Sequence, residues 1–190
     1  TINRNFVPTE DATTVRRLRD AGAVLLGKLA QTEGAFADHH PKIPPPVNPW
    51  GEALWPGASS SGSGVATAAG LCFGSLGTDT GGSVRIPAAL NGVAALRPTP
   101  GLVPTKGVFP VSWTYDVVGP LARSAGDLAL AYAALTGDAA AAAALAGAPL
   151  AFAEALGAMW GTAAAEAKYY PIVDIPIPST VPLRPGGLEI

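Results

Sequence analysis

The sequence predicts an α/β protein, because two helix-and-strand units follow one another along the chain. In the first unit, an amphipathic stretch at residues 11–19 is followed by a short apolar run at residues 23–26. In the second, a helix of small side chains at residues 65–72 precedes an apolar segment at residues 73–77. Helices that alternate with short buried strands are typical of a sheet covered by helices.

Composition supports a single globular domain with a substantial core. The chain has 190 residues, of which 48% are hydrophobic and 14% charged, and its net charge is −2. Such a balance argues against a disordered chain and against nucleic acid or an anionic membrane as partner. No apolar run is long enough for a membrane span, and the first residues do not resemble a signal peptide. A lone cysteine, Cys72, excludes internal disulfides and multi-cysteine metal sites, so we expect a cytoplasmic protein.

Local signals set the limits of the expected elements. Asp11 is a candidate cap for the first helix and Gly22 a candidate end. Prolines crowd residues 41–56 and predict an extended loop there. Further on, Ser124 and Asp127 resemble a capping box that opens a helix over residues 128–135, with Gly137 as its stop.

A change in composition divides the chain into two parts. Residues 1–137 form the expected core, and residues 138–190 are expected to add an alanine-rich helical segment and an extended C-terminal arm to the same domain. Alanine favours helix. The prolines at 176 and 178 indicate an edge strand or arm rather than a central strand.

Two glycine- and serine-rich segments, residues 57–64 and 77–83, are the candidates for chemistry. A flexible linker and a tight turn are the plain alternatives. However, the first segment runs directly into an apolar helix. In the second, two glycines before Ser83 leave consecutive N–H groups free to face one cavity, as an oxyanion hole beside a nucleophile requires. No Gly-x-Ser-x-Gly elbow is present, which disfavours an α/β-hydrolase nucleophile.

A proton acceptor for Ser83 is less obvious. His39 and His40 are adjacent, so at most one of them faces a given site, and surface or loop roles are more common. A neutral lysine or a hydroxyl relay are the other options. Ser59 precedes a helix and Ser83 follows a strand, which predicts that both serine loops meet at one end of the sheet.

These segments together resemble the amidase signature family. The resemblance rests on the serine segments at residues 57–63 and 77–83, on Arg85-Ile86-Pro87, and on residues 11–13, 22–28, 92–99, 101–103 and 116–123. It covers residues 6–137 and is weak beyond them. It implies a mixed, mostly parallel twisted sheet flanked by helices on both faces. It also implies hydrolysis of a carboxylic amide to carboxylate and ammonia or amine through a serine acyl-enzyme, without metal or cofactor.

The resemblance assigns roles residue by residue. Ser83 matches the nucleophile, and Ser59 matches the serine on a cis peptide that relays its proton. We therefore expect the two hydroxyl oxygens to lie about 2.6 to 3.2 Å apart. The remaining matches are the oxyanion-hole N–H groups of Thr80, Gly81, Gly82 and Ser83, and the supporting residues Asp79, Arg85 and Ser60.

The family's catalytic lysine is not matched in this chain. It belongs to an upstream Lys-Asp motif, and Lys28 falls on a different family segment. Three interpretations stay open: an amide hydrolase or part of one, an amidotransferase subunit that passes ammonia to a partner, and an inactive scaffold without its base. The expected partner is a small-molecule amide, with a homodimer left open. Four aromatic residues are candidates to line a substrate pocket, although buried aromatic residues more often belong to the core. They are Trp50, Trp55, Trp113 and Tyr115.

Overall fold

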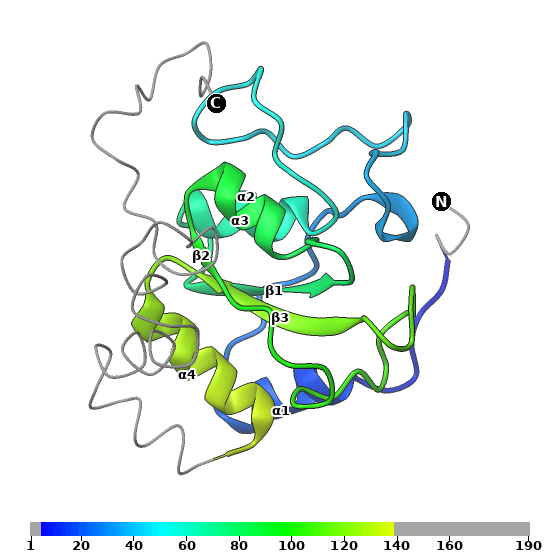
Figure 1. Cartoon of the computed structure of the whole chain (residues 1–190), viewed down its shortest axis with the longest axis vertical. Coiled ribbons are helices and arrows are strands. Elements are labelled where there is room, and N and C mark those ends of the chain that lie inside the picture. The colour runs from blue at the N-terminus through cyan, green and yellow to red at the C-terminus, as the bar shows by residue number, and fades with distance from the viewer. Residues whose placement is uncertain (1–4, 139–190) are drawn as a thin grey trace.

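The computed structural model describes residues 5–138, in which helices pack against a small sheet (Figure 1). The elements in chain order are helix α1 (Thr13–Asp20), the 3-10 turn η1 (Glu33–Ala35), helix α2 (Ser61–Ala68), strand β1 (Gly74–Asp79), helix α3 (Arg85–Asn91), strand β2 (Ala94–Ala95), strand β3 (Val117–Ala122) and helix α4 (Ala125–Thr136).

The described strands form one sheet in the order β1-β3-β2. Both edges of β3 pair antiparallel, with Gly74 opposite Ala122 on one side and Ala94 opposite Ala122 on the other. Consequently β1 and β2 run in the same direction and are connected through α3, but β3 is inserted between them. The expected parallel pairing is therefore not found between neighbouring described strands, because the crossover unit is split by a third strand.

Helices cover both faces of this sheet, as predicted. Helices α2 and α3 lie on one face, and α1 and α4 lie on the other (Figure 1). Leu121 and Val84 are buried in the core under α3, and Leu128 and Leu135 are buried in the core under α4. The α/β class is confirmed, and the sheet separates the buried residues under α3 from those under α4.

Helix starts follow the local signals in one case and not in the other, whereas Gly22 ends α1 as expected, with a φ of 88°. The Ser124 hydroxyl accepts a hydrogen bond from the N–H of Asp127, and Gly137 ends α4 with a φ of 73°. Helix α1, in contrast, begins after Ala12 without a side-chain cap. Asp11 is instead ion-paired with Arg19 at 2.7 Å.

The strand predicted at residues 23–26 is wrong. Val24 and Leu26 are 83% and 74% exposed, and no described strand lies beside them. An apolar run forms a strand only where a neighbour can pair with its backbone. The predicted loop at residues 41–56 is confirmed, and the alanine-rich segment and the C-terminal arm lie outside the described residues.

Helix α3 and strand β3 were not predicted. Pro87 stands in the first turn of α3, where its missing N–H has no intrahelical partner to lose. Pro120 lies in β3, the central described strand, where a proline is unusual. Its carbonyl still accepts the N–H of Leu96 at 3.1 Å. Helix α3 and strand β3 therefore each contain a proline at a position that the structure tolerates.

Candidate active site

The first serine segment forms the turn that leads into α2. Ser59, Ser60 and Ser61 are all buried, and the peptide bond between Ala58 and Ser59 is cis. Residues 30–32 hold this turn, because the carbonyl of Ser59 accepts the N–H of Thr32 and Gly62 donates to the carbonyl of Ala30. A Cβ at Gly62 would lie 2.5 Å from that carbonyl oxygen, so glycine is required for the close approach.

Ser60 fastens this turn to strand β1. Its hydroxyl accepts the N–H of Thr78 at 3.2 Å and lies 3.4 Å from the Thr78 carbonyl oxygen. One turn further along α2, the Ser63 hydroxyl donates to the carbonyl of Leu76 at 2.7 Å. A Cβ at Gly77 would lie 2.4 Å from the Ser60 hydroxyl oxygen, which explains the glycine in the strand. Ser60 thus links the two serine segments, which agrees with the supporting position expected for it.

The second segment is the loop between β1 and α3, and Asp79 organises it from inside. The Asp79 side chain is fully buried. Its Oδ1 accepts the N–H of Gly82 at 2.8 Å, and its Oδ2 accepts the N–H of Val84 at 3.1 Å. Arg85 adds hydrogen bonds from Nε and Nη2, each at 3.0 Å. A single carboxylate therefore closes the loop that carries Ser83.

Ion pairing keeps this buried carboxylate charged. Burial raises the pKa of Asp79, but the Arg85 guanidinium and the N–H groups of Val84 and Gly82 outweigh it, so the pKa lies below its ordinary value. The hydrogen bond with Asp79 in turn raises the pKa of Arg85. Asp79 and Arg85 thus brace the loop by a charge-assisted contact.

The two serine segments lie side by side, as predicted. The N–H of Ser60 donates to the carbonyl of Ser83 at 3.1 Å. The hydrogen bond expected between the hydroxyls is absent, however, because the Ser59 hydroxyl oxygen is buried without a partner among the described residues. Ser83 itself is half-buried. The contact between the segments is made through the carbonyl of Ser83, and no hydrogen bond joins the Ser59 and Ser83 hydroxyls.

One of the four expected oxyanion donors is already engaged. The N–H of Gly82 donates to Asp79, which is the nearest acceptor because the loop folds around that carboxylate. The N–H groups of Thr80, Gly81 and Ser83 form no hydrogen bond to another described residue. A Cβ at Gly81 would meet nothing within 4 Å, so this part of the loop is open. The arrangement offers three donors rather than four.

Sequence reasoning missed two residues that bind the loop. Arg97 donates from Nε to Asp79 Oδ1 at 3.2 Å and from Nη2 to the carbonyl of Tyr115 at 2.8 Å. Asp116 accepts the Thr80 hydroxyl at 2.5 Å. Both residues stand within the segments that resemble the family, but neither carries a signal of its contact in the local pattern.

The histidines do not reach either candidate catalytic serine by a hydrogen bond. His39 Nε2 lies 2.8 Å from the Ser61 hydroxyl oxygen, and His40 lies 3.7 Å from Glu33. Lys28 is exposed. Among the described residues no cluster of side chains suits a metal ion, and no helix is long and apolar enough to cross a membrane.

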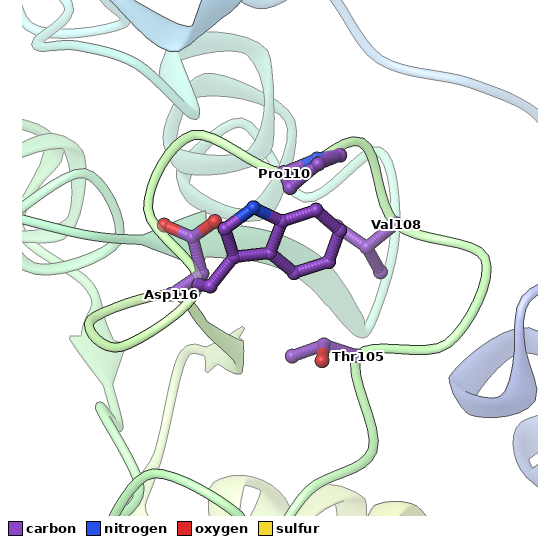
Figure 2. A pocket seen from close by; sticks show the side chains of 5 residues that line it. Thr105, Val108, Pro110 and Asp116 are labelled. Carbon is purple, nitrogen blue, oxygen red and sulfur yellow. The ribbon is translucent and has the colours of Figure 1, made fainter.

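The aromatic candidates separate into two groups. Trp50 donates to the carbonyl of Asn91 at 2.8 Å and therefore has a structural contact, and Trp55 is half exposed. Trp113 and Tyr115 are 89% and 62% exposed. Trp113 lines a small pocket, and the other side chains around this pocket are those of Thr105, Val108, Pro110 and Asp116 (Figure 2).

Comparison with known proteins identifies relatives of this arrangement. The family model described as Amidase matches residues 1–155. A putative amidase, AmiD, of Mycobacterium tuberculosis is 54% identical over 138 residues, which are 73% of this chain and 29% of the relative. A glutamyl-tRNA(Gln) amidotransferase subunit of Nitratidesulfovibrio vulgaris is 43% identical over 72% of this chain and 28% of its own length.

Solved structures agree with the sequence relatives. The native peptide amidase from Stenotrophomonas maltophilia superposes with a TM-score of 0.64 and 44% identity, over 74% of this chain and 31% of that one. This chain thus spans about 30% of the length of the proteins it matches. The fold, the paired serine segments and the family match lead to one conclusion: the chain belongs to the amidase family.

Proposed function

We propose that this chain carries the nucleophile and the oxyanion donors of an enzyme that hydrolyses a carboxylic amide. The observation that carries the proposal is the pairing of the two serine segments, with the Ser59 hydroxyl buried and unpartnered among the described residues beside the loop of Ser83. A buried hydroxyl without a partner is costly and is expected where a reacting group completes the contact. Ser83, being half-buried at the end of an open loop, is accessible to a small substrate.

In the proposed reaction the Ser83 oxygen forms a bond to the amide carbonyl carbon. Its proton passes to Ser59, whose own proton passes on to a base. The negative oxygen of the tetrahedral intermediate accepts hydrogen bonds from the N–H groups of Thr80, Gly81 and Ser83. The C–N bond then breaks, and the leaving nitrogen takes a proton. Water releases the acyl group as carboxylate and restores the Ser83 hydroxyl.

The base is the part of the proposal that lies outside the described residues. Neither Lys28, which is exposed, nor His39, which contacts Ser61, forms a hydrogen bond with Ser59. The relatives are about three times as long as the stretch matched here. We therefore propose that the base of the whole enzyme comes from a part of the family sequence that this chain does not match.

Labelling with a fluorophosphonate tests the nucleophile directly. In the whole enzyme, which also supplies the base, the probe should modify Ser83, mapped by mass spectrometry of the tryptic peptide, and Ser83→Ala should abolish the label. Ser112→Ala is the matched control, because Ser112 is also half-buried and lies in a neighbouring loop. Label on another serine, or label that survives in Ser83→Ala, would contradict the assignment.

An amidotransferase subunit is the second candidate, because relatives with that name are 43% to 46% identical to this chain. Such a subunit would pass the released ammonia to a partner. The two functions separate by one measurement on the whole enzyme. A hydrolase releases free ammonia from simple aliphatic or aryl amides without a partner, whereas an amidotransferase subunit depends on one.

A further inference from the structure

The loop of Ser83 is held from a second side by the turn at residues 111–116. The Thr80 hydroxyl donates to Asp116 Oδ1 at 2.5 Å. Independently, Arg97 bridges Asp79 Oδ1 and the carbonyl of Tyr115 at 3.2 and 2.8 Å. Both links come from the same turn. They end at Asp79 and Thr80, the two residues at the start of the loop.

Asp116 is itself fixed. Its second oxygen, Oδ2, accepts the N–H groups of Val111 at 2.7 Å and Ser112 at 2.9 Å. Desolvation raises the pKa of Asp116, but the Thr80 hydroxyl and these two N–H groups outweigh it, so the carboxyl has a pKa below its ordinary value. With both oxygens bound to different partners, the carboxylate cannot rotate without losing contacts. It therefore transmits the position of the turn to Thr80.

We propose that Asp116 and Arg97 are positioning residues that aim the oxyanion donors. Thr80 is the first of the three N–H groups free to bind an oxyanion, and its side chain is tied to Asp116. Asp79, which holds Gly82 and Val84, is tied to Arg97. Neither positioning residue touches the reacting atoms. This inference rests on the proposed function of the loop, and it adds which residues hold the oxyanion donors in position.

The consequence for catalysis follows from geometry. A donor stabilises an oxyanion only when it lies in hydrogen-bond reach of the developing charge, and the loss of one donor costs about 100- to 1000-fold in rate. Losing the Thr80 tether misdirects that donor without removing it, so a smaller cost of about 10- to 100-fold is expected. The core of the domain is not altered, because Asp116 and Thr80 are only half-buried.

The test compares Asp116→Asn, Thr80→Val and their double variant, with amide exchange measured in this chain and labelling measured in the whole enzyme, which also supplies the base. Thr80→Ser keeps the hydroxyl and is the rescue variant. Asp127→Asn is the matched control, because Asp127 also accepts a serine hydroxyl, from Ser124 at 2.8 Å, but lies on α4. Two readouts are taken: NMR hydrogen exchange of the Gly82 amide, which Asp79 protects, and the second-order rate of fluorophosphonate labelling of Ser83.

The expected result is faster exchange of the Gly82 amide and about 10- to 100-fold slower labelling in Asp116→Asn and Thr80→Val. The double variant should match the single ones, since both remove one shared link. Thr80→Ser should recover most of the rate that Thr80→Val loses, because it keeps the hydroxyl, and Asp127→Asn should stay within about 3-fold of the parent rate. Unchanged exchange, or additive effects on it, would overturn the inference. If the parent whole enzyme, which also supplies the base, does not label at Ser83, the proposed function fails, while the exchange result still decides whether Asp116 holds the loop.

Discussion

Replacing Asp79 with asparagine should destabilise the fold severely, and the geometry of its carboxylate explains why. Each oxygen accepts from more than one N–H group. Gly82, Arg85 Nη2 and Arg97 surround Oδ1, while Val84 and Arg85, through both its backbone N–H and Nε, surround Oδ2. Whichever way the asparagine amide is turned, its NH₂ group therefore meets donors. The substitution removes the negative charge and adds unfavourable contacts at once.

The magnitude follows from burial. The Asp79 side chain is fully buried, and the exposed fractions of Arg85 and Arg97 are 33% and 22%. Removing one partner from a buried, hydrogen-bonded ion pair costs about 3 to 5 kcal/mol. The whole free energy of unfolding of a domain is about 5 to 15 kcal/mol. Asp79→Asn should therefore remove a large share of the stability of this chain.

Urea denaturation followed by tryptophan fluorescence measures this loss. Asp11→Asn is the matched control, because Asp11 pairs with Arg19 at 2.7 Å, but the two side chains are 45% and 62% exposed. That exposed pair should contribute about 0 to 1 kcal/mol. If the two substitutions lower the free energy of unfolding equally, or if Asp79→Asn costs less than about 1 kcal/mol, the reasoning from burial is refuted.

Three further predictions concern packing, pH and activity. Gly119→Ala should cost about 1 to 3 kcal/mol or more in urea denaturation, because its Cβ would lie 2.2 Å from the Leu96 carbonyl oxygen, whereas Gly51→Ala, with its nearest atom at 3.4 Å, should be tolerated. The Asp79 pKa is lowered by folding, so its stabilisation is present above the ordinary carboxyl pKa of about 3.9 and is lost as pH falls through the lower folded value. Acid titration by circular dichroism should show a shallower loss in Asp79→Asn than in the parent chain. This chain alone should hydrolyse amides weakly, with little change in Ser83→Ala, whereas a chain that also supplies the family's Lys-Asp motif should lose nearly all of its ammonia release in Ser83→Ala.

Elements specified by local chemistry were predicted well from the sequence. Helix α4 begins at the Ser124 cap and ends at Gly137 as expected, and β1 overlaps the apolar segment before Thr80. The contacts that begin and end α4 are formed within a few residues of the chain, whereas β1 also depends on its pairing with β3. The strand expected at residues 23–26 failed for the opposite reason, because a strand depends on a neighbour that the local pattern does not specify.

The sequence predicted that the two serine segments meet, but not the hydrogen bonds that hold the loop of Ser83. The family motifs identified Ser59, Ser83 and Asp79 as candidate site residues, and in the structure their segments are in contact. The links through Arg97 and Asp116 depend on contacts across 18 to 36 positions of the chain. No spacing rule reports such contacts, since they arise only when the sheet has brought the loops together.

The split arrangement of the sheet explains why the loop needs these distant contacts. Strand β3 enters between β1 and β2, so its first residue, Val117, lies opposite Asp79 at the end of β1. The residue before it, Asp116, is thereby delivered to Thr80, the residue after Asp79. Antiparallel pairing in this register thus places one turn against the other as a geometric necessity. A slip of the register by two residues would keep the same faces buried but would separate Asp116 from Thr80. The position of the loop of Ser83 is therefore tied to the register of β3 against β1.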